Sequence, residues 1–365
     1  MSGKIRVGIL FGGKSAEHEV SLQSAKNVLE ALDREKYEPI LIGIDKSGKW
    51  LLNDQSKFLL NAEDPKRIRL NPQSEAVVLA PQSGGAIVKL TEGRSGGAVD
   101  VVFPLLHGPF GEDGTAQGLL KLADIPFVGA GVLGSAVGMD KDVMKRLLRD
   151  GGVPIGKFLV FQVHESAPAF KTVIEKLGLP FFIKPANMGS SVGINKVHNE
   201  MEYHPAVKEA FEYDRKVILE EFIDGRELEC AVLGNETLEA SVPGEVISAH
   251  EFYSYNAKYL DENGAALEIP AKLPNELVEE IQDLAIRTFQ ALNCEGLARV
   301  DFFLRGNREL FVNEINTIPG FTRISMYPKL WEASGIGYTE LIGRLLDLAI
   351  ARHRQEKGLK TSYEA

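Results

Sequence analysis

The first third of this chain alternates buried strands with amphipathic helices, and this pattern limits the folds available to it. Residues 5–11 (IRVGILF) are apolar at almost every position, which is typical of a parallel strand covered on both faces. Apolar residues then recur at helical spacing over 22–32, with Ser21 as the expected N-cap. We therefore predict an α/β fold that begins with a doubly wound parallel sheet. Further strands are expected over 39–44 and 99–106, and a helix over 115–123.

The 365 residues are enough for two or three domains at about 150 residues each. Residues 46–97 are rich in Gly, Ser, Gln and Pro, and we interpret them as variable excursions from the first unit. The composition changes after Gly129, and Gly225 begins a last segment with its own strands. We predict domains over 1–128, 129–223 and 224–365, the last two of α+β type, with a long polar excursion at 248–264 in the third.

Charge and composition exclude several classes of protein. The formal net charge is −10, which argues against DNA or another polyanion as the main partner. Cys230 and Cys294 allow one bridge but no disulfide scaffold, and we expect reduced thiols in a cytoplasmic protein. The N-terminus has only a short apolar run and no cleavage site, so we predict no signal peptide. No apolar stretch approaches the roughly 18 residues of a membrane span.

Residues 8–15 (GILFGGKS) match the phosphate-binding pattern G-x-x-x-x-G-K-[ST] letter for letter. That mechanism needs the middle residues to form a loop whose amides face phosphates, whereas these residues lie in the predicted first strand. We interpret the segment as a tight turn from strand to loop. A nucleotide-binding switch that uses Lys14 and Ser15 stays open as an alternative.

Polar loops follow two predicted strands, at the edge where open α/β sheets bind ligands. Residues 12–21 (GGKSAEHEVS) follow the first strand, and residues 106–115 (LHGPFGEDGT) follow another. Glu17 is either a substrate contact or a favourable anion at a helix N-terminus. His107 is either a ligand contact or a packed, hydrogen-bonded histidine. The recurrence of polar loops at strand ends favours a site between them.

A Gly-Ser turn follows a predicted strand that carries Lys184 near its end. Residues 183–194 (IKPANMGSSVGI) place glycines where backbone amides can approach an anion, and serines where hydroxyl groups add donors. Such a hairpin can cover phosphates, although a plain surface turn has the same composition.

Two predicted strands near the C-terminus carry polar side chains at alternate positions. Arg299 and Asp301 are two residues apart, as are Glu314 and Asn316, so each pair shares a strand face. Adjacent strands would bring Asp301, Glu314 and Asn316 into an all-oxygen cluster suited to Mg²⁺ that bridges nucleotide phosphates. Arg299 would then stabilise developing negative charge. Acidic residues on a solvated strand face are the alternative.

Together these features resemble the ATP-grasp superfamily, whose members join a carboxylate to an amine through an acylphosphate. The finer resemblance is to the D-alanine–D-alanine ligases, and it extends over almost the whole chain. It implies a three-domain ATP-grasp fold in which the two α+β domains sandwich ATP, with residues 46–97 as an insertion of the longer bacterial subtype. The motifs that carry it are FGGKSAEHEVSLQSA, LHGPFGEDGTAQG, MDKDVMKRLL, IKPANMGSSVGINKV, NAKY, ARVDFF and VNEINTIPGFTRISMYP.

The resemblance implies an ATP-dependent ligase that joins two D-alanines through D-alanyl phosphate and supplies D-alanyl-D-alanine for peptidoglycan. Its cofactors would be ATP and two Mg²⁺ ions, which Mn²⁺ can replace. The enzyme would be a cytoplasmic homodimer without nucleic-acid or membrane partners. An ATP-grasp ligase of another specificity, such as a D-alanine–D-lactate enzyme, is the alternative, and the Lys258-Tyr259 pair in the predicted lid at 248–264 argues against it.

The resemblance also assigns roles to residues around the two amino acids. Glu17 would receive the ammonium group of the first D-alanine, and Ser190 and Tyr259 would tie Glu17 to the lid. His107 would lie close to this first subsite. The other assignments are Arg299 and the Gly320 amide at the oxyanion site, and Ser325 with Met326 at the second subsite.

On the nucleotide side, the resemblance assigns Lys141, Lys184 and Ser191 to ATP, with both lysines on its phosphates. Lys258 would reach the γ-phosphate from the closing lid, and Glu227 would take the ribose hydroxyls. One residue of the predicted adenine site departs from the family pattern, because some relatives carry Lys where this chain has Glu221. The predicted adenine site comprises Glu220, Glu221, Phe222 and Ile223, and the predicted Mg²⁺ ligands are Asp301, Glu314 and Asn316.

Overall fold

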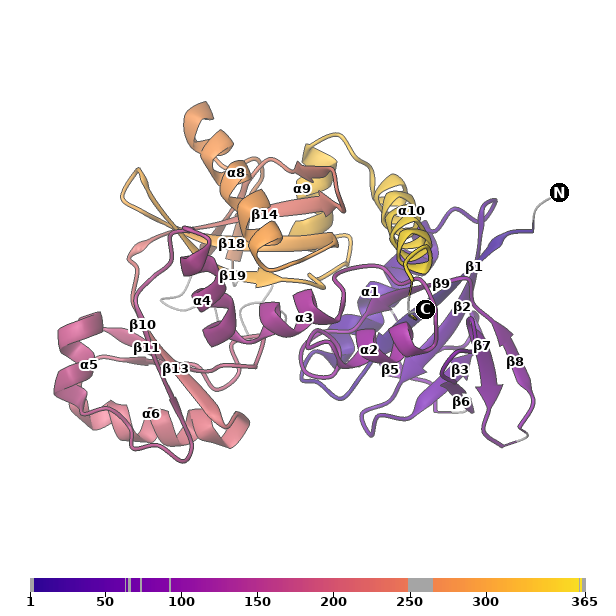
Figure 1. Cartoon of the computed structure of the whole chain (residues 1–365), viewed down its shortest axis with the longest axis horizontal. Helices are drawn as coiled ribbons and strands as arrows, with labels where there is room; N and C mark the ends of the chain where they lie inside the picture. The colour runs from indigo at the N-terminus through magenta and orange to yellow at the C-terminus, as the bar shows by residue number, and fades with distance from the viewer. Residues whose placement is uncertain are drawn as a thin grey trace.

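The computed structural model describes residues 3–62, 64, 67–72, 74–91, 93–248, 265–360 and 362. Within these residues three large sheets follow one another along the chain, and helices pack beside each of them (Figure 1). Each sheet lies inside one of the three predicted segments, and the exact domain boundaries stay a prediction. No helix in the described part of the chain combines the length and apolar composition needed to cross a bilayer.

The centre of the first sheet is parallel, as predicted. β1 (Ile5–Gly12) pairs in parallel with β2 (Tyr37–Ile44) on one side and with β9 (Val101–Leu105) on the other. α1 (His18–Ala31) connects β1 to β2, and α2 (Thr115–Leu122) follows β9. Because these strands run in the same direction, the polar loops after β1 and β9 lie at the same edge of the sheet.

The structure corrects the interpretation of residues 46–97 as excursions. β3 (Trp50–Asn53) pairs antiparallel with β2, and three more strands continue the sheet outward in the order β8-β7-β6-β3-β2-β1-β9. The segment is therefore an antiparallel extension of the first sheet, and its short apolar runs are strands of that sheet. The remaining bounds are β6 (Glu75–Leu79), β7 (Ala86–Lys89), β8 (Ser95–Ala98) and a separate pair, β4 (Leu59–Leu60) with β5 (Arg69–Leu70).

The prediction of Ser21 as a helix N-cap is wrong. α1 begins at His18, so Ser21 lies inside its first turn. The buried Ser21 hydroxyl accepts a hydrogen bond from the Gly12 amide at 2.7 Å and donates one to the carbonyl oxygen of Leu105. Ser21 therefore links α1 to the ends of β1 and β9. Apolar spacing located the buried stripe of the helix but not its first residue.

The second sheet is antiparallel, in the order β10-β13-β11-β12. Val173, Phe181 and Tyr203 are fully buried in the core that α5 and α6 form on this sheet. In Figure 1 the unit is a lobe that projects from the rest of the molecule. Its bounds are β10 (Phe158–Gln162), α5 (Phe170–Leu177), β11 (Phe181–Pro185), β12 (Asn195–Val197), α6 (Glu200–Tyr213) and β13 (Lys216–Glu221), and α3 (Val132–Met139) and α4 (Lys141–Asp150) precede it.

The third sheet is centred on β14 (Gly225–Gly234), which pairs antiparallel with β18 (Gly296–Arg305) along its whole length. β18 also pairs with β19 (Glu309–Asn316), and α8 (Asn275–Ala291) buries its apolar side against these strands. The order is β17-β16-β14-β18-β19. The other bounds are β15 (Leu238–Ala240), β16 (Gly244–Ser248), β17 (Ala265–Glu268) and α9 (Met326–Ala333).

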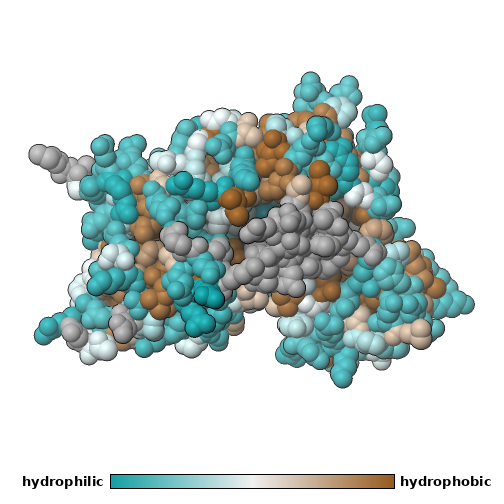
Figure 2. All heavy atoms as spheres, turned by 180° about the vertical axis from the view of Figure 1, so that it is seen from behind, coloured by the Kyte–Doolittle hydropathy of each residue, from teal (hydrophilic) through white to brown (hydrophobic). Residues whose placement is uncertain are grey.

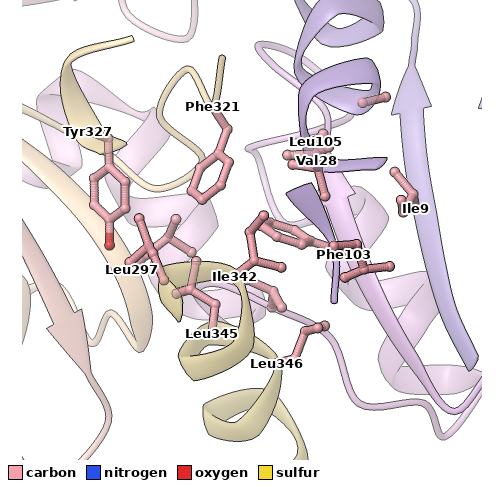
Figure 3. Close-up of a cluster of buried hydrophobic side chains, with 14 of the residues drawn as sticks. Ile9, Val28, Phe103, Leu105, Leu297, Phe321, Tyr327, Ile342, Leu345 and Leu346 are labelled. Carbon is pink, nitrogen blue, oxygen red and sulfur yellow. The ribbon is translucent and has the colours of Figure 1, made fainter. Parts of the chain in front are cut away.

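The last helix, α10 (Tyr338–Lys357), returns to the first sheet. Figure 3 shows Leu345 and Leu346 of α10 in one apolar cluster with Phe103 of β9 and with Phe321. The rings of Phe103 and Phe321 lie 5.3 Å apart between centroids. One core therefore joins the first and third units. This packing fixes the polar loops of the first unit relative to those of the third.

Arg352 of α10 is buried and anchors the segment that leads from the first sheet to α3. Its guanidinium donates to the carbonyl oxygens of Gly129 at 2.6 Å and Phe127 at 2.8 Å, and lies 3.3 Å from the Glu295 carboxylate. We expect Arg352→Met to lower the free energy of unfolding by about 2 kcal/mol, because two buried carbonyls lose a charged donor. Urea unfolding measures this loss.

Arg344→Met is the matched control for that experiment. Arg344 lies on the same helix and pairs with Glu340, but its side chain is 40% exposed. We expect this variant to lose less than about 1 kcal/mol, as is usual for surface ion pairs. Equal losses for the two variants would contradict an anchoring role for Arg352.

Candidate active site

The structure excludes a phosphate-binding loop at residues 8–15. Residues 8–11 lie in β1 between β2 and β9, so their amides belong to the sheet, and the Gly12 amide donates to the Ser21 hydroxyl. The Lys14 ammonium lies 5.3 Å from the centre of the Phe110 ring, in the loop after β9. The alternative of a switch protein that uses Lys14 and Ser15 is therefore wrong, and the interpretation as a turn from strand to loop is confirmed.

The predicted oxygen cluster forms on two adjacent strands. Asp301 of β18 lies opposite Glu314 of β19, and Arg299 lies opposite Asn316. The Asn316 side-chain amide donates to the Asp301 carboxylate at 2.9 Å. β19 carries one extra residue, Asn313, at a bulge next to this pair, and such bulges redirect side chains beside functional sites.

The donor set of this cluster fits Mg²⁺ that is shared with a nucleotide. Within the described residues no three His, Cys, Asp or Glu side chains are grouped so that they could hold a metal ion by themselves. Two carboxylates and one amide oxygen, from Asp301, Glu314 and Asn316, are nevertheless typical for Mg²⁺ that takes its other ligands from phosphates and water. These residues could therefore hold Mg²⁺ when a nucleotide is present.

Arg299 is fixed in place by two carboxylates. Its guanidinium donates to both oxygens of Asp301, at 2.7 and 2.8 Å, and its Nε lies 2.8 Å from Glu229. Burial alone would lower the pKa of Arg299, but Asp301 and Glu229 outweigh burial and raise the pKa well above its ordinary value. The side chain is therefore a permanent, oriented cation. Glu229 lies within an ordinary strand pattern of β14, and the sequence carried no signal for this contact.

Three lysines gather beside this cluster. Lys184 of β11 lies 2.5 Å from Glu220, and Lys145 of α4 lies 2.7 Å from the other oxygen of the same carboxylate. The Lys141 ammonium lies 3.4 Å from Glu314 and donates to the Met188 carbonyl at 2.9 Å. Sequence analysis predicted Lys141 and Lys184 here but missed Lys145, which the helical pattern of α4 gave no reason to separate from other lysines.

The Glu220 carboxylate is held in its ionised form. Burial would raise the pKa of this carboxyl group, but Lys145 and Lys184 outweigh burial and lower the pKa to about 2. The same contact raises the pKa of Lys184, against the effect of burial. Both oxygens of the Glu220 side chain are bound to lysines. In the predicted adenine site, Glu220 can therefore contribute only through its backbone.

The three lysines and the rest of the predicted adenine segment lie around one cavity. The Glu221 carboxylate accepts a hydrogen bond from the Lys157 amide at 2.7 Å. The centroids of the Phe222 and Phe182 rings lie 6.1 Å apart. The Lys196 ammonium lies 3.9 Å from the centroid of the Phe222 ring. The cavity has a volume of about 540 Å³ and is lined by Lys141, Lys184, Ser190, Ser191, Glu220, Glu221, Phe222, Ile223, Glu227, Asp301 and Glu314, among others.

Glu17 lies where the first and second units meet. A methyl group added to Gly108 would lie 3.4 Å from Oε2 of Glu17, and one added to Gly189 would lie 3.3 Å from it. The carboxylate is therefore packed between the loop after β9 and the Gly-Ser hairpin, and it is 8% exposed. The hairpin bends sharply here, with Ser190 in the left-handed region at φ 50°.

In this part of the site, two of the buried polar atoms that lack a hydrogen-bond partner among the described residues are His107 Nε2 and Ser190 Oγ. His107 Nδ1 lies 3.0 Å from the Ile318 carbonyl, so Nδ1 carries the hydrogen and Nε2 keeps a lone pair. Burial lowers the pKa of His107, which keeps the ring neutral. A neutral acceptor and a hydroxyl group are thus available for a ligand.

The segment after β19 brings the remaining predicted residues together. A methyl group added to Gly320 would lie 3.1 Å from Ser325 Oγ, and Ser325 Oγ accepts a hydrogen bond from the Thr322 amide at 3.0 Å. Met326 begins α9 and is buried. Glu112 fastens this segment to the first unit, because its two oxygens accept hydrogen bonds from the Gly108 and Ile318 amides.

Lys258 and Tyr259 lie outside the described residues, as does the predicted lid apart from Ser248. The described walls of the site come from all three units. In Figure 2 the lobe of β10–β13 lies at the lower right, and a notch at the lower edge separates it from the rest of the molecule.

The sheets and the site define a class of protein, an ATP-grasp enzyme. Two family models match the chain: one described as D-ala D-ala ligase N-terminus matches residues 6–130, and one described as D-ala D-ala ligase C-terminus matches residues 147–347. A D-alanine–D-alanine ligase from Oceanobacillus iheyensis is 56% identical over 98% of this chain and 99% of its own. The chain belongs to the D-alanine–D-alanine ligase family.

Solved structures agree with this assignment. The D-alanine–D-alanine ligase from Coxiella burnetii is similar with a TM-score of 0.85 and 39% identity, covering 97% of this chain and 96% of that one. The VanG D-Ala:D-Ser ligase from Enterococcus faecalis is similar with a TM-score of 0.84 and 38% identity, covering 95% of this chain and all of that one. Ligases named for D-alanine and for D-serine as the second amino acid therefore have closely similar folds.

Proposed function

We propose that this protein joins two D-alanine molecules into D-alanyl-D-alanine, and that ATP drives the reaction through D-alanyl phosphate. The position of Glu17 is the observation that supports this most. Its buried carboxylate lies between the His107 loop and the Gly-Ser hairpin, and His107 Nε2 and Ser190 Oγ are both without a partner among the described residues. Such an anionic site, closed by glycines, suits the ammonium group of a small amino acid.

The neighbouring cavity takes the nucleotide in this proposal. Lys141 and Lys184 hold the phosphates together with Ser191, and Glu227 holds the ribose. The adenine lies against residues 221–223 and the backbone of Glu220, whose side chain is bound to Lys145 and Lys184. Asp301, Glu314 and Asn316 would hold two Mg²⁺ ions, for which Mn²⁺ can substitute. When bound, these ions neutralise charge on the transferring phosphoryl group. The lysines act in the same direction, since they place fixed positive charge at the phosphate end of the cavity.

Arg299 and the Gly320 amide serve the second step. When the neutral amine of the second D-alanine attacks the acylphosphate, negative charge develops on the carbonyl oxygen. Arg299 is already oriented by Asp301 and Glu229, so it can stabilise that charge without reorganisation. Ser325 and Met326 line the second subsite. Lys258 and Tyr259 would close the site from the lid and exclude water that hydrolyses the acylphosphate.

The resemblance supports three further parts of the proposal. The dipeptide would enter peptidoglycan synthesis, the protein would work in the cytoplasm, and two copies would form a homodimer. D-alanine and ATP would be its partners, with no role for nucleic acid.

The first test is the release of phosphate from ATP. We expect the purified chain to release phosphate with D-alanine and Mg²⁺, and we expect D-alanyl-D-alanine in the product by mass spectrometry. L-Alanine should not support the reaction, because the relatives of this chain are D-alanine ligases. Chelation of divalent metal should stop it, and Mn²⁺ should restore it.

Equal rates with L-alanine and D-alanine would refute the proposed substrate. D-Serine and D-lactate, each added with D-alanine, test the acceptor, because the VanG enzyme named above is a D-Ala:D-Ser ligase. A mixed product that exceeds D-alanyl-D-alanine would assign the chain to another acceptor while leaving the ATP-grasp chemistry intact.

A further inference from the structure

A buried charge triad connects α4 to the nucleotide cavity. Lys145, Glu220 and Lys184 come from α4, β13 and β11, and their side chains are only 4%, 7% and 12% exposed. Each oxygen of the Glu220 carboxylate takes one lysine, Oε1 with Lys145 at 2.7 Å and Oε2 with Lys184 at 2.5 Å. Removing three charges from water costs free energy, which their mutual attraction must offset. The triad has two cations for one anion, so the role of the second lysine needs an explanation.

The net charge of the triad supplies that reason. Lys184 and Glu220 alone would form a neutral pair, in which the ammonium group that faces the cavity is cancelled by its own carboxylate. Lys145 adds a second positive charge on the far side of Glu220 and leaves the triad with a net charge of +1. Charges interact more strongly in the low dielectric of a protein interior than in water. The change from a neutral pair to a net charge of +1 therefore strengthens the attraction of the triad for the phosphates.

We propose that Lys145 is a positioning residue for ATP. It neutralises the Glu220 carboxylate from the side opposite Lys184, so that Lys184 presents an effective positive charge to the phosphates. The inference rests on the proposed function, which places Lys184 on those phosphates. Lys145 also lies 3.4 Å from the Asn313 carbonyl, at the bulge beside Glu314, so its position is fixed from the metal side of the site as well. Lys145 does not itself need to touch the nucleotide.

The test compares charge variants of the triad by their affinity for Mg²⁺ with a non-hydrolysable ATP analogue. We expect Lys145→Met to weaken this binding by at least about tenfold, because one partner of a buried charge network is lost. Lys145→Arg keeps the charge and should stay within about threefold of the native protein. Adenosine, which lacks phosphates, should bind to all three proteins equally.

The double variant Lys145→Met with Glu220→Gln separates charge balance from packing. It removes one positive and one negative charge, so Lys184 again stands alone with a net charge of +1. We expect its affinity for the ATP analogue to return to within about threefold of native. Should Lys145→Met fail to fold, this variant carries the test alone, and a tenfold weaker affinity would overturn the inference.

Arg149→Met is the control for a lost cation on α4, because Arg149 is exposed on the same helix. It should leave the affinity for the analogue unchanged. Lys184→Met separates the two levels of the proposal: if it does not weaken binding, the placement of Lys184 in the proposed function fails. If Lys184→Met weakens binding but Lys145→Met does not, or if the double variant is as weak as Lys145→Met, only the role of Lys145 is overturned.

Discussion

Glu314→Gln is expected to lower the rate of D-alanine-dependent phosphate release by about 10³-fold, since several kcal/mol of charge stabilisation are lost with one metal-binding carboxylate. An amide oxygen is a weaker, neutral ligand for Mg²⁺. Lys141, which lies 3.4 Å from Glu314, loses its anionic neighbour at the same time. Folding should change little, because the Glu314 side chain is 27% exposed and its strand pairing is made by the backbone. Rates at saturating ATP and D-alanine, with a Mg²⁺ titration and a melting curve, measure each part.

Glu309→Gln is the matched control for this prediction. Glu309 is at the other end of β19 and its side chain is 65% exposed, so the substitution changes the same strand by the same chemistry away from the cavity. We expect near-native activity and stability. A lowered melting temperature for Glu314→Gln, with normal activity in the folded fraction, would instead make Glu314 a structural residue.

The strands that carry Asp301, Glu314 and Asn316 are the part of the site that the sequence predicts best. Alternation places Asp301 on one face of its strand and Val300 on the other, and this holds in the structure because a strand has a period of two. β19 runs over Glu309–Asn316, so Glu314 and Asn316 lie on one strand, as predicted. The same reasoning found the parallel strands β1, β2 and β9, whose continuous apolar runs reflect burial on both faces.

Contacts between distant segments could not be predicted in this way. Residues 46–97 are polar enough to suggest loops. Their short apolar runs become strands because β3 pairs with β2, and β6, β7 and β8 then pair outward from β3. Lys145, Glu112 and Glu229 looked like ordinary polar residues, because their partners lie on other elements. Ser21 was predicted to cap α1, whereas its hydroxyl bonds to Leu105, more than eighty residues away.

Glu112 provides the second large effect, through pH. Its carboxyl group bonds to the amides of Gly108 and Ile318 and so fastens the segment before Gly320 to the loop after β9. Burial raises the pKa of Glu112 to about 8, and the negative charge of Glu17 adds to the rise. Burial and the neighbouring negative charge thus favour the protonated form of Glu112. In the proposed function, that form would let Glu17 face the ammonium group of the substrate without a second anion beside it.

We expect Glu112 by itself to lower the free energy of unfolding by up to about 1.4 kcal/mol per pH unit as the pH rises from about 5 to 8. The sign follows from proton binding: in this range the folded protein holds a proton on Glu112 that the unfolded chain has released. The stabilisation is complete below the ordinary pKa of 4.5 and is lost as the pH passes through 8. Glu112→Gln mimics the protonated form and does not titrate. Its stability relative to the native protein should therefore increase with pH over this window, as measured by urea unfolding at each pH.

The difference between the two proteins matters more than either curve, because the other titrating groups are common to both. Gln keeps one acceptor oxygen, so Glu112→Gln should lose one of the two amide contacts at every pH, which adds a constant offset of about 1 kcal/mol. Glu309→Gln again controls for the substitution itself. If the difference between Glu112→Gln and the native protein is the same at pH 5 and at pH 8, Glu112 is ionised in the folded state across this range. The Gly108 and Ile318 amides would then bind a carboxylate, and Glu17 would face the substrate with a second negative charge beside it.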